Sequence, residues 1–153
     1  MAEEVLPVQS EYQHVGFWKR FVAFLIDSFV LVAIMVPLLA AVYGWGYFDA
    51  ARTGFAGPWD FLVQVVLPAV AAIVFWRYKG ATPGKMAISA TIVDARTGQA
   101  PSTKQLVVRY FAYFVSILPL FIGFAWIGFD RRKQGFHDKI AGTLVIHDKV
   151  NKK

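Results

Sequence analysis

The stretch that decides the fold is residues 17–43, FWKRFVAFLIDSFVLVAIMVPLLAAVY. A helix needs about 20 apolar residues to span the hydrocarbon core of a bilayer, so this stretch is long enough to cross a membrane. It contains one carboxylate, Asp27, which lies roughly 10 Å inside the boundary marked by Trp18 and Arg20. An isolated charge at that depth costs about 2.5 to 3.5 kcal/mol, so we expect Asp27 to have a polar partner from elsewhere in the chain.

The composition is typical of a small membrane protein. Of the 153 residues, 57% are hydrophobic and 17% are charged, whereas charged residues make up about 25% of soluble domains. The chain has no cysteine, which excludes disulfides and thiolate metal sites. The net charge of +6 comes from clusters that flank apolar segments, as membrane topology signals do, so we expect no nucleic-acid binding.

Two further apolar segments follow the first. Residues 61–79 predict a second span, which the basic residues Arg77 and Lys79 extend at its end. Residues 102–129 open with a capping-box sequence and stay apolar, but proline and glycine residues interrupt them. We therefore expect an all-α membrane protein, a small helical bundle with two full transmembrane helices and a helical hairpin broken by proline and glycine.

The remaining segments predict a small sheet and two tails. Residues 86–94 alternate with a period of two and residues 143–147 are strand-forming, so we expect a short cytoplasmic element that resembles a β-hairpin. Residues 1–14 are expected to form a flexible N-terminal tail, residues 15–147 the membrane domain, and residues 148–153 a basic C-terminal tail.

The positions of lysine and arginine predict the sidedness of the chain. Lys19 and Arg20 lie at the entrance of the first span, one basic residue lies in the first loop, six lie from Arg77 to Arg109, and seven follow Phe129. The positive-inside rule therefore places the N-terminus, the second loop and the C-terminus in the cytoplasm. We favour a hairpin within residues 106–129 that returns the chain to the cytoplasm, but this segment is also long enough for a third crossing.

Four motifs together resemble one known family. They are residues 16–27 (GFWKRFVAFLID), residues 80–85 (GATPGK), Arg109-Tyr110, and residues 137–145 (HDKIAGTLV). In this order they resemble the RDD family of bacterial membrane proteins, which is named for an arginine and two aspartates that match Arg20, Asp27 and Asp138. The resemblance implies a multi-pass protein of the bacterial cytoplasmic membrane. Ion transport has been proposed for some family members, and others look like assembly partners.

Asp27 is the centre of the first candidate site. Arg109 lies roughly 10 Å along its own helix, so both charges reach a similar depth from the same side, and we expect them to pair. Two interpretations of this pair stay open. It either locks the packing of the helices or takes part in proton or cation movement, because ionisable residues inside membranes are functional candidates.

Asp138 is the centre of the second candidate site. We expect it to anchor the C-terminal segment through a salt bridge to Arg20 or Lys85. The alternative is the cytoplasmic mouth of a cation path, in which His137 titrates near neutral pH. A metal site built from His137, Asp138 and His147 has only weak support from the spacing.

Residues 80–86, GATPGKM, superficially resemble a nucleotide-binding phosphate loop. The spacing between the glycines is one residue short, and a methionine stands where a hydroxyl must meet magnesium, so we reject nucleotide binding. We expect a tight turn in which Gly84 adopts unusual backbone angles and Lys85 reaches the headgroups of anionic lipids. No serine, histidine and acid arrangement is apparent, and we expect neither a cofactor nor enzymatic activity.

Two functions therefore stay open. We favour a homo-oligomer that moves a proton, a cation or a small solute, with Asp27 as the titrating group and Arg109 and Arg20 as its charge partners. One copy has too few spans to enclose a path alone, so transport requires self-association. The alternative is a membrane scaffold that docks a partner through the glycine and alanine faces of its spans.

Overall fold

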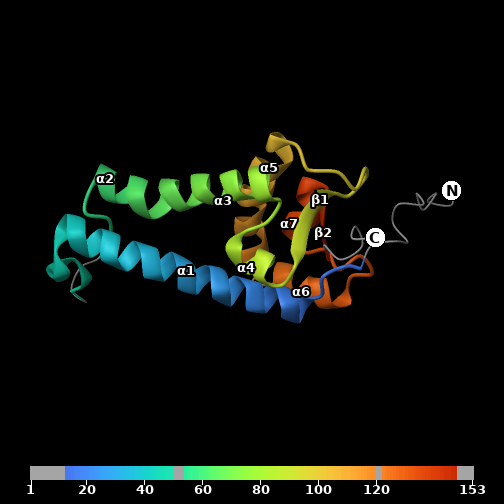
Figure 1. Cartoon of the computed structure of the whole chain (residues 1–153), viewed down its shortest axis with the longest axis horizontal. Helices are drawn as coiled ribbons and strands as arrows, with labels where there is room; N and C mark the ends of the chain where they lie inside the picture. Colours follow the sequence, from blue (N-terminus) through green and yellow to red (C-terminus); the bar gives the residue numbers. More distant parts are fainter. Residues whose placement is uncertain (1–12, 50–53, 120–121, 148–153) are drawn as a thin grey trace.

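The computed structural model describes residues 13–49, 54–119 and 122–147. Two long helical segments lie antiparallel and form an extended hairpin (Figure 1). The first is α1 (Phe17–Tyr43), followed by the short 3-10 helix η2 (Trp45–Phe48), and the second comprises α2 (Pro58–Phe61), η3 (Leu62–Val66) and α3 (Leu67–Lys79). Two segments, Phe17–Tyr43 and Pro58–Ala87, are each long and apolar enough to cross a membrane.

Glycines end both long helices. Gly44 and Gly80 follow α1 and α3 with φ angles of 77° and 68°, and the N–H of Gly80 donates to the carbonyl of Trp76. This left-handed conformation suits glycine and closes the last turn of α3. Arg77 and Lys79 lie in that turn, where cations are favoured at the negative end of the helix dipole.

The two predicted strands form the expected antiparallel pair. Strand β1 (Ala90–Asp94) pairs with β2 (Thr143–His147), so that Ala90 lies opposite His147 and Asp94 opposite Thr143. Residues of the N-terminal segment join them, since the N–H of Val15 donates to Val145 and His14 forms a bridge with Ile146. Three distant parts of the sequence therefore meet at one end of the hairpin.

The helix predicted over residues 102–129 is broken, as expected. Helices α5 (Thr103–Ile117) and α6 (Ile122–Phe129) are bent by 100° relative to each other. The predicted capping box is present, because Ser102 accepts from the N–H of Gln105 and the Gln105 side chain accepts from the N–H of Ser102. In Figure 1, α5 crosses behind the end of α3 at a steep angle and does not run alongside the long helices.

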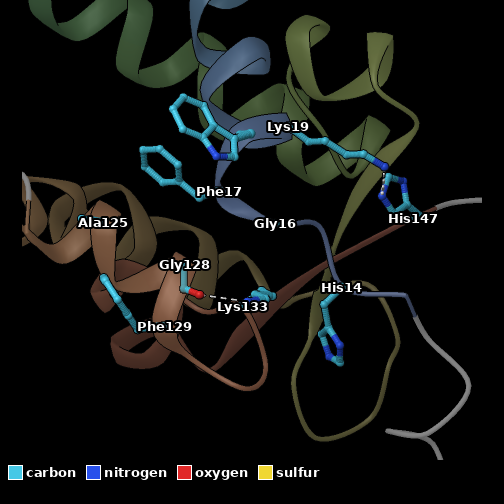
Figure 2. Close-up of a pocket in the computed structure, with 10 residues that line it drawn as sticks. His14, Gly16, Phe17, Lys19, Ala125, Gly128, Phe129, Lys133 and His147 are labelled. Atoms are coloured by element: carbon cyan, nitrogen blue, oxygen red, sulfur yellow. Dashed lines mark hydrogen bonds between the residues drawn. The ribbon is translucent and has the colours of Figure 1, made fainter.

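We call residues 13–16, 80–119 and 122–147 the base. It also contains α4 (Pro83–Ala87) and α7 (Phe136–Ala141). An apolar core joins the base to the end of α3. Trp76 of α3 packs there with Val15, Ala90, Ile92, Leu106 and Val145. A pocket opens between the start of α1 and the end of α6 (Figure 2).

Two local predictions are wrong. The strand predicted over residues 86–94 begins only at Ala90, because Pro83 starts the helix α4, which extends to Ala87. Gly84 lies in that helix and has no positive φ angle. Glycine is needed there for space, since a Cβ atom would lie 2.0 Å from the carbonyl oxygen of Ala23 in α1.

In its coarse form the predicted fold is confirmed. The protein is mostly helical, with two candidate membrane-spanning helices and a two-stranded antiparallel sheet. The predicted tails fall largely outside the described residues, which begin at residue 13 and end at residue 147.

Candidate functional site

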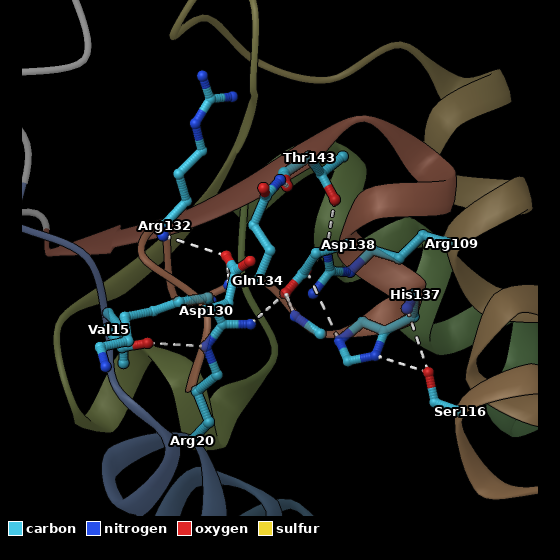
Figure 3. Close-up of polar contacts among 12 residues, drawn as sticks. Val15, Arg20, Arg109, Ser116, Asp130, Arg132, Gln134, His137, Asp138 and Thr143 are labelled. Carbon is cyan, nitrogen blue, oxygen red and sulfur yellow. Dashed lines mark hydrogen bonds and ion pairs between the residues drawn. The ribbon is translucent and has the colours of Figure 1, made fainter. Parts of the chain in front are cut away.

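Asp138 is the centre of a buried ion-pair network in the base (Figure 3). One of its carboxylate oxygens pairs with Arg20 of α1, and the other pairs with Arg109 of α5. The side chains of Asp138 and Arg109 are fully buried and Arg20 is 8% exposed. The predicted bridge to Arg20 is therefore present, whereas the alternative bridge to Lys85 is not formed.

Neighbouring groups satisfy most of the remaining donors of the network. Arg20 donates to the carbonyls of Val15 at 2.9 Å and Lys133 at 2.5 Å. Arg109 donates to the hydroxyl of Thr143 at 2.5 Å, and the N–H of Gly135 donates to Asp138 at 3.0 Å. The network thereby ties α1, α5, α7 and β2 to one another.

The charge of Asp138 is fixed by its two arginines. Burial alone would raise the pKa of this carboxyl, but Arg109 and Arg20 hold it well below its usual value. The carboxylate therefore stays ionised at physiological pH. An ionised carboxylate between two guanidinium groups suits an anchor of the C-terminal segment better than a proton carrier.

The predicted pair between Asp27 and Arg109 is wrong. Asp27 accepts a hydrogen bond from the hydroxyl of Thr82 at 2.5 Å and another from the N–H of Gly84 at 2.7 Å. Similar depth was not sufficient for contact, because α4 occupies the side of α1 that carries Asp27 while Arg109 turns towards α7. Asp27 thus caps the N-terminus of α4, where N–H groups favour a carboxylate.

Lys85 lies inside the base, although the sequence predicted that its side chain would be exposed. Its side chain is 9% exposed, its ammonium lies 3.5 Å from the hydroxyl of Tyr113, and it sits 5.6 Å from the ring centroid of Trp76. One face of α4 packs closely on α1 through Gly84, which turns Lys85 towards the core. The prediction that Lys85 holds anionic lipid is therefore not supported by its position.

His137 is buried and neutral, contrary to the prediction that it titrates near neutral pH. Burial lowers its pKa to about 3, because this effect outweighs the opposing attraction of Asp138. The imidazole stacks on Tyr113 at a centroid distance of 4.3 Å and contacts Phe124 at 5.0 Å. Within the part of the chain that the structure describes, no three histidine, aspartate or glutamate side chains come close enough to hold a metal ion. His137, Asp138 and His147 therefore do not form the weakly supported metal site.

The structure does bring together a serine, a histidine and an aspartate, which the sequence did not reveal. The hydroxyl of Ser116 lies 3.2 Å from Nδ1 of His137, whose Nε2 lies 3.6 Å from Asp138. Ser116 is fully buried and already accepts from the N–H of His137 at 3.1 Å, and both oxygens of Asp138 bind arginines. A substrate has no access to this hydroxyl, so we interpret the group as packing between α5 and α7.

A second buried carboxylate, at the far end of the hairpin, was missed. Asp60 is fully buried and accepts from the hydroxyl of Tyr47 at 2.6 Å, the N–H of Ala56 at 2.7 Å and the amide of Gln64 at 3.0 Å. The only sequence signal was an acidic residue directly before the predicted second span, a position that is common at exposed helix ends. This cluster joins the loop after α1 to the start of the second long helix.

The fold and the network define a membrane protein with a long apolar helical hairpin and a base held together by a buried ion-pair network. The family model of the RDD family matches residues 14–142. The chain belongs to this family, which confirms the resemblance seen in the motifs.

Three relatives illustrate the similarity. The uncharacterized protein RP437 of Rickettsia prowazekii is 49% identical over 74 residues, which cover 48% of this chain and only 40% of the relative. The uncharacterized membrane protein YteJ of Bacillus subtilis is 27% identical over 93% of this chain and 86% of its own length. The uncharacterized protein YxaI of the same organism is 28% identical over 86% of this chain and 96% of its own length. No solved structure matches.

Proposed function

We propose that this RDD protein is an assembly module of the bacterial cytoplasmic membrane, in which the helical hairpin associates with hairpins of further copies. The observation that carries this proposal is the low burial of the two long helices, each of which is only 11% buried over its most apolar 18 residues. Helix α1 makes its main contacts with α4, η2 and α6 rather than with the other long helix, α3. A single copy therefore leaves most of the hairpin surface to be covered by lipid or by other helices.

Exposed bulky side chains are distributed along both helices. On α1, Phe29 is 76% exposed and Ile34 is 60% exposed, and on α3, Val70 is 52% exposed. Alanines lie between these side chains at residues 69, 71 and 72, and small residues allow helices to approach closely within a membrane. These features suit self-association of the hairpin.

The base suits the role of a rigid platform on the cytoplasmic side. Residues 13–15, β1 and β2 are in contact, so the chain between β1 and β2 returns to the same end of the hairpin. The bend of 100° between α5 and α6 supports a returning segment over a third crossing. Thirteen of the sixteen lysines and arginines lie at the end of α3, in the second loop, in α5 or after Phe129, which favours the cytoplasm for the base.

Transport of a proton, a cation or a small solute is the second candidate function. One observation favours transport. Among the described residues, Asp27 is bound by the neutral donors Thr82 and Gly84 and has no cationic partner. A path of this kind would run between copies of the hairpin, with Asp27 as the proton- or cation-binding group. Its charge partners would not be Arg20 and Arg109, since both arginines bind Asp138.

Two measurements separate these functions. The mass of the purified protein in detergent or nanodiscs gives the oligomeric state, and we expect a homo-oligomer. A purely monomeric protein over a wide range of protein-to-lipid ratios would refute both functions, because each of them requires hairpins of several copies to associate.

Flux measurements in liposomes then test transport. Proton and cation gradients are applied to the wild type, to Asp27→Asn and to Asp49→Asn, which changes an exposed carboxylate as a matched control. An oligomer without flux supports the assembly module. Flux that Asp27→Asn abolishes and Asp49→Asn preserves would establish transport instead.

A further inference from the structure

The pocket at the edge of the base has a volume of 630 Å³ and combines two kinds of lining (Figure 2). One part is basic, with Lys19 of α1 and Lys133 from the loop after α6. The other part is apolar, with Phe17 and Trp18 of α1 and Phe129 of α6. A cavity of this mixed character suits a ligand that has an anionic group and an apolar part.

The two lysines are free of carboxylate partners within the described residues. The ammonium of Lys19 lies 3.1 Å from Nε2 of His147, and that of Lys133 donates to the carbonyl of Gly128 at 2.9 Å. No aspartate or glutamate belongs to the described lining of the pocket. Two lysines therefore line the same pocket, one directed towards His147 and the other towards Gly128 (Figure 2), and no acidic side chain of the described lining offsets their charges, which favours binding of an anion.

The apolar part of the lining continues onto the surface of the hairpin. Trp18 is 75% exposed and Phe129 is 84% exposed, and further along α1 Phe24 is 63% exposed. Tryptophan is enriched where protein meets the boundary between headgroups and hydrocarbon. The apolar side of the pocket thus faces in the direction in which the acyl chains of a lipid would lie.

We propose that this pocket binds one anionic glycerophospholipid, with its phosphate between Lys19 and Lys133 and its acyl chains along Phe17 and Phe129. The pocket also contains Gly16, the N-cap of α1, and no side chain caps this helix end. Its N–H groups add to the attraction for a phosphate, although the two lysines and the apolar wall provide the specificity. This lipid site is independent of the oligomeric state and of any transport.

The test is native mass spectrometry of the full-length protein in detergent, titrated with phosphatidylglycerol or phosphatidylcholine. We expect one phosphatidylglycerol to be retained per chain and phosphatidylcholine to be lost. In the double variant Lys19→Gln with Lys133→Gln, the affinity for phosphatidylglycerol should fall roughly thirtyfold, as expected for two lysines at a headgroup. The matched control is Lys79→Gln with Lys104→Gln, which removes two exposed charges away from the pocket and should leave the affinity unchanged.

A steric variant keeps the proposal testable if the double variant does not fold. A Cβ atom added to Gly128 meets no atom within 4 Å, so Gly128→Leu extends into open space at the pocket without disturbing the backbone. We expect it to abolish retention of phosphatidylglycerol while all charges remain. Circular dichroism and gel filtration show whether each variant is folded.

Three results would overturn the proposal. One is equal affinity of the pocket variants and the control variant for phosphatidylglycerol, and another is equal retention of phosphatidylcholine by the wild type. The third is displacement of the lipid by inorganic phosphate at comparable concentration, which would identify the pocket as a site for a soluble anion.

Discussion

Asp138 in the base and Asp27 on α1 are held in different ways. Asp138 binds two buried arginines that reach it from different helices, and its charge cannot change without leaving those guanidinium groups unpaired. Asp27 binds a hydroxyl and a backbone N–H, both of them neutral. The two motif aspartates therefore have separate tasks: Asp138 joins the base together, and Asp27 positions α4 against α1.

The largest difference between the two sites should appear on neutralising each aspartate. Asp138→Asn leaves Arg20 and Arg109 buried without an anion, which should lower the free energy of unfolding by about 3 to 5 kcal/mol. The measurement is reversible unfolding in mild detergent, followed by the fluorescence of Trp126 in the base and of Trp76, which packs against it from α3. A loss below about 1 kcal/mol would mean that water reaches the arginines and that the network is not a structural lock.

The contact between α4 and α1 depends on space rather than on charge. Gly84→Ala should destabilise the protein by about 1 to 3 kcal/mol, because the added methyl group collides with the backbone of α1 at Ala23. Thermal unfolding of this variant should be compared with that of Gly128→Ala, where the added methyl group meets no neighbour within 4 Å. Equal stability of the two variants would show that α4 does not pack closely on α1.

The base should also lose stability in mild acid. The unfolded chain binds a proton at His137 below about pH 6.5, but the folded chain does so only near pH 3, so the free energy of unfolding decreases as the pH falls between these values. The expected decrease is about 2 kcal/mol from pH 7 to pH 5. Asp138 does not contribute to this decrease between pH 7 and pH 5, because its stabilising effect is lost only below the usual pKa of an aspartate.

His137→Gln isolates this effect. Glutamine does not titrate, so the variant should have a flatter dependence of stability on pH than the wild type, whatever its stability at pH 7. An unchanged pH dependence would show that His137 is accessible to water and protonates with an ordinary pKa.

Much of the architecture could be predicted from local signals. The capping box at Ser102 and the strand-forming residues 143–147 depend on neighbours in the sequence, and both form as expected. Arg20 was one of the two partners expected for Asp138, and the bridge between them is present.

Lateral contacts between distant segments could not be predicted in the same way. The depth of Asp27 and Arg109 along their helices was estimated from the helical rise, but depth does not determine which helix lies beside which. The tight crossing at Gly84 is equally invisible in the sequence, because a glycine required for space and a glycine required for a turn look alike. Ser116 and Asp60 were missed because a single polar residue in an apolar segment gives no indication of its partners.

The smallest effect is expected at Asp27 itself. In Asp27→Asn the side-chain oxygen can still accept from Thr82 or Gly84, so the loss should be about 0.5 to 1.5 kcal/mol, the usual contribution of a neutral hydrogen bond. Thr82→Val should cost a similar amount, because it removes one donor and keeps the shape of the side chain. Both variants are measured by the same unfolding assay as Asp138→Asn. A loss at Asp27 as large as that at Asp138 would contradict the distinction between the two aspartates and would mean that the charge of Asp27 is itself essential to the fold.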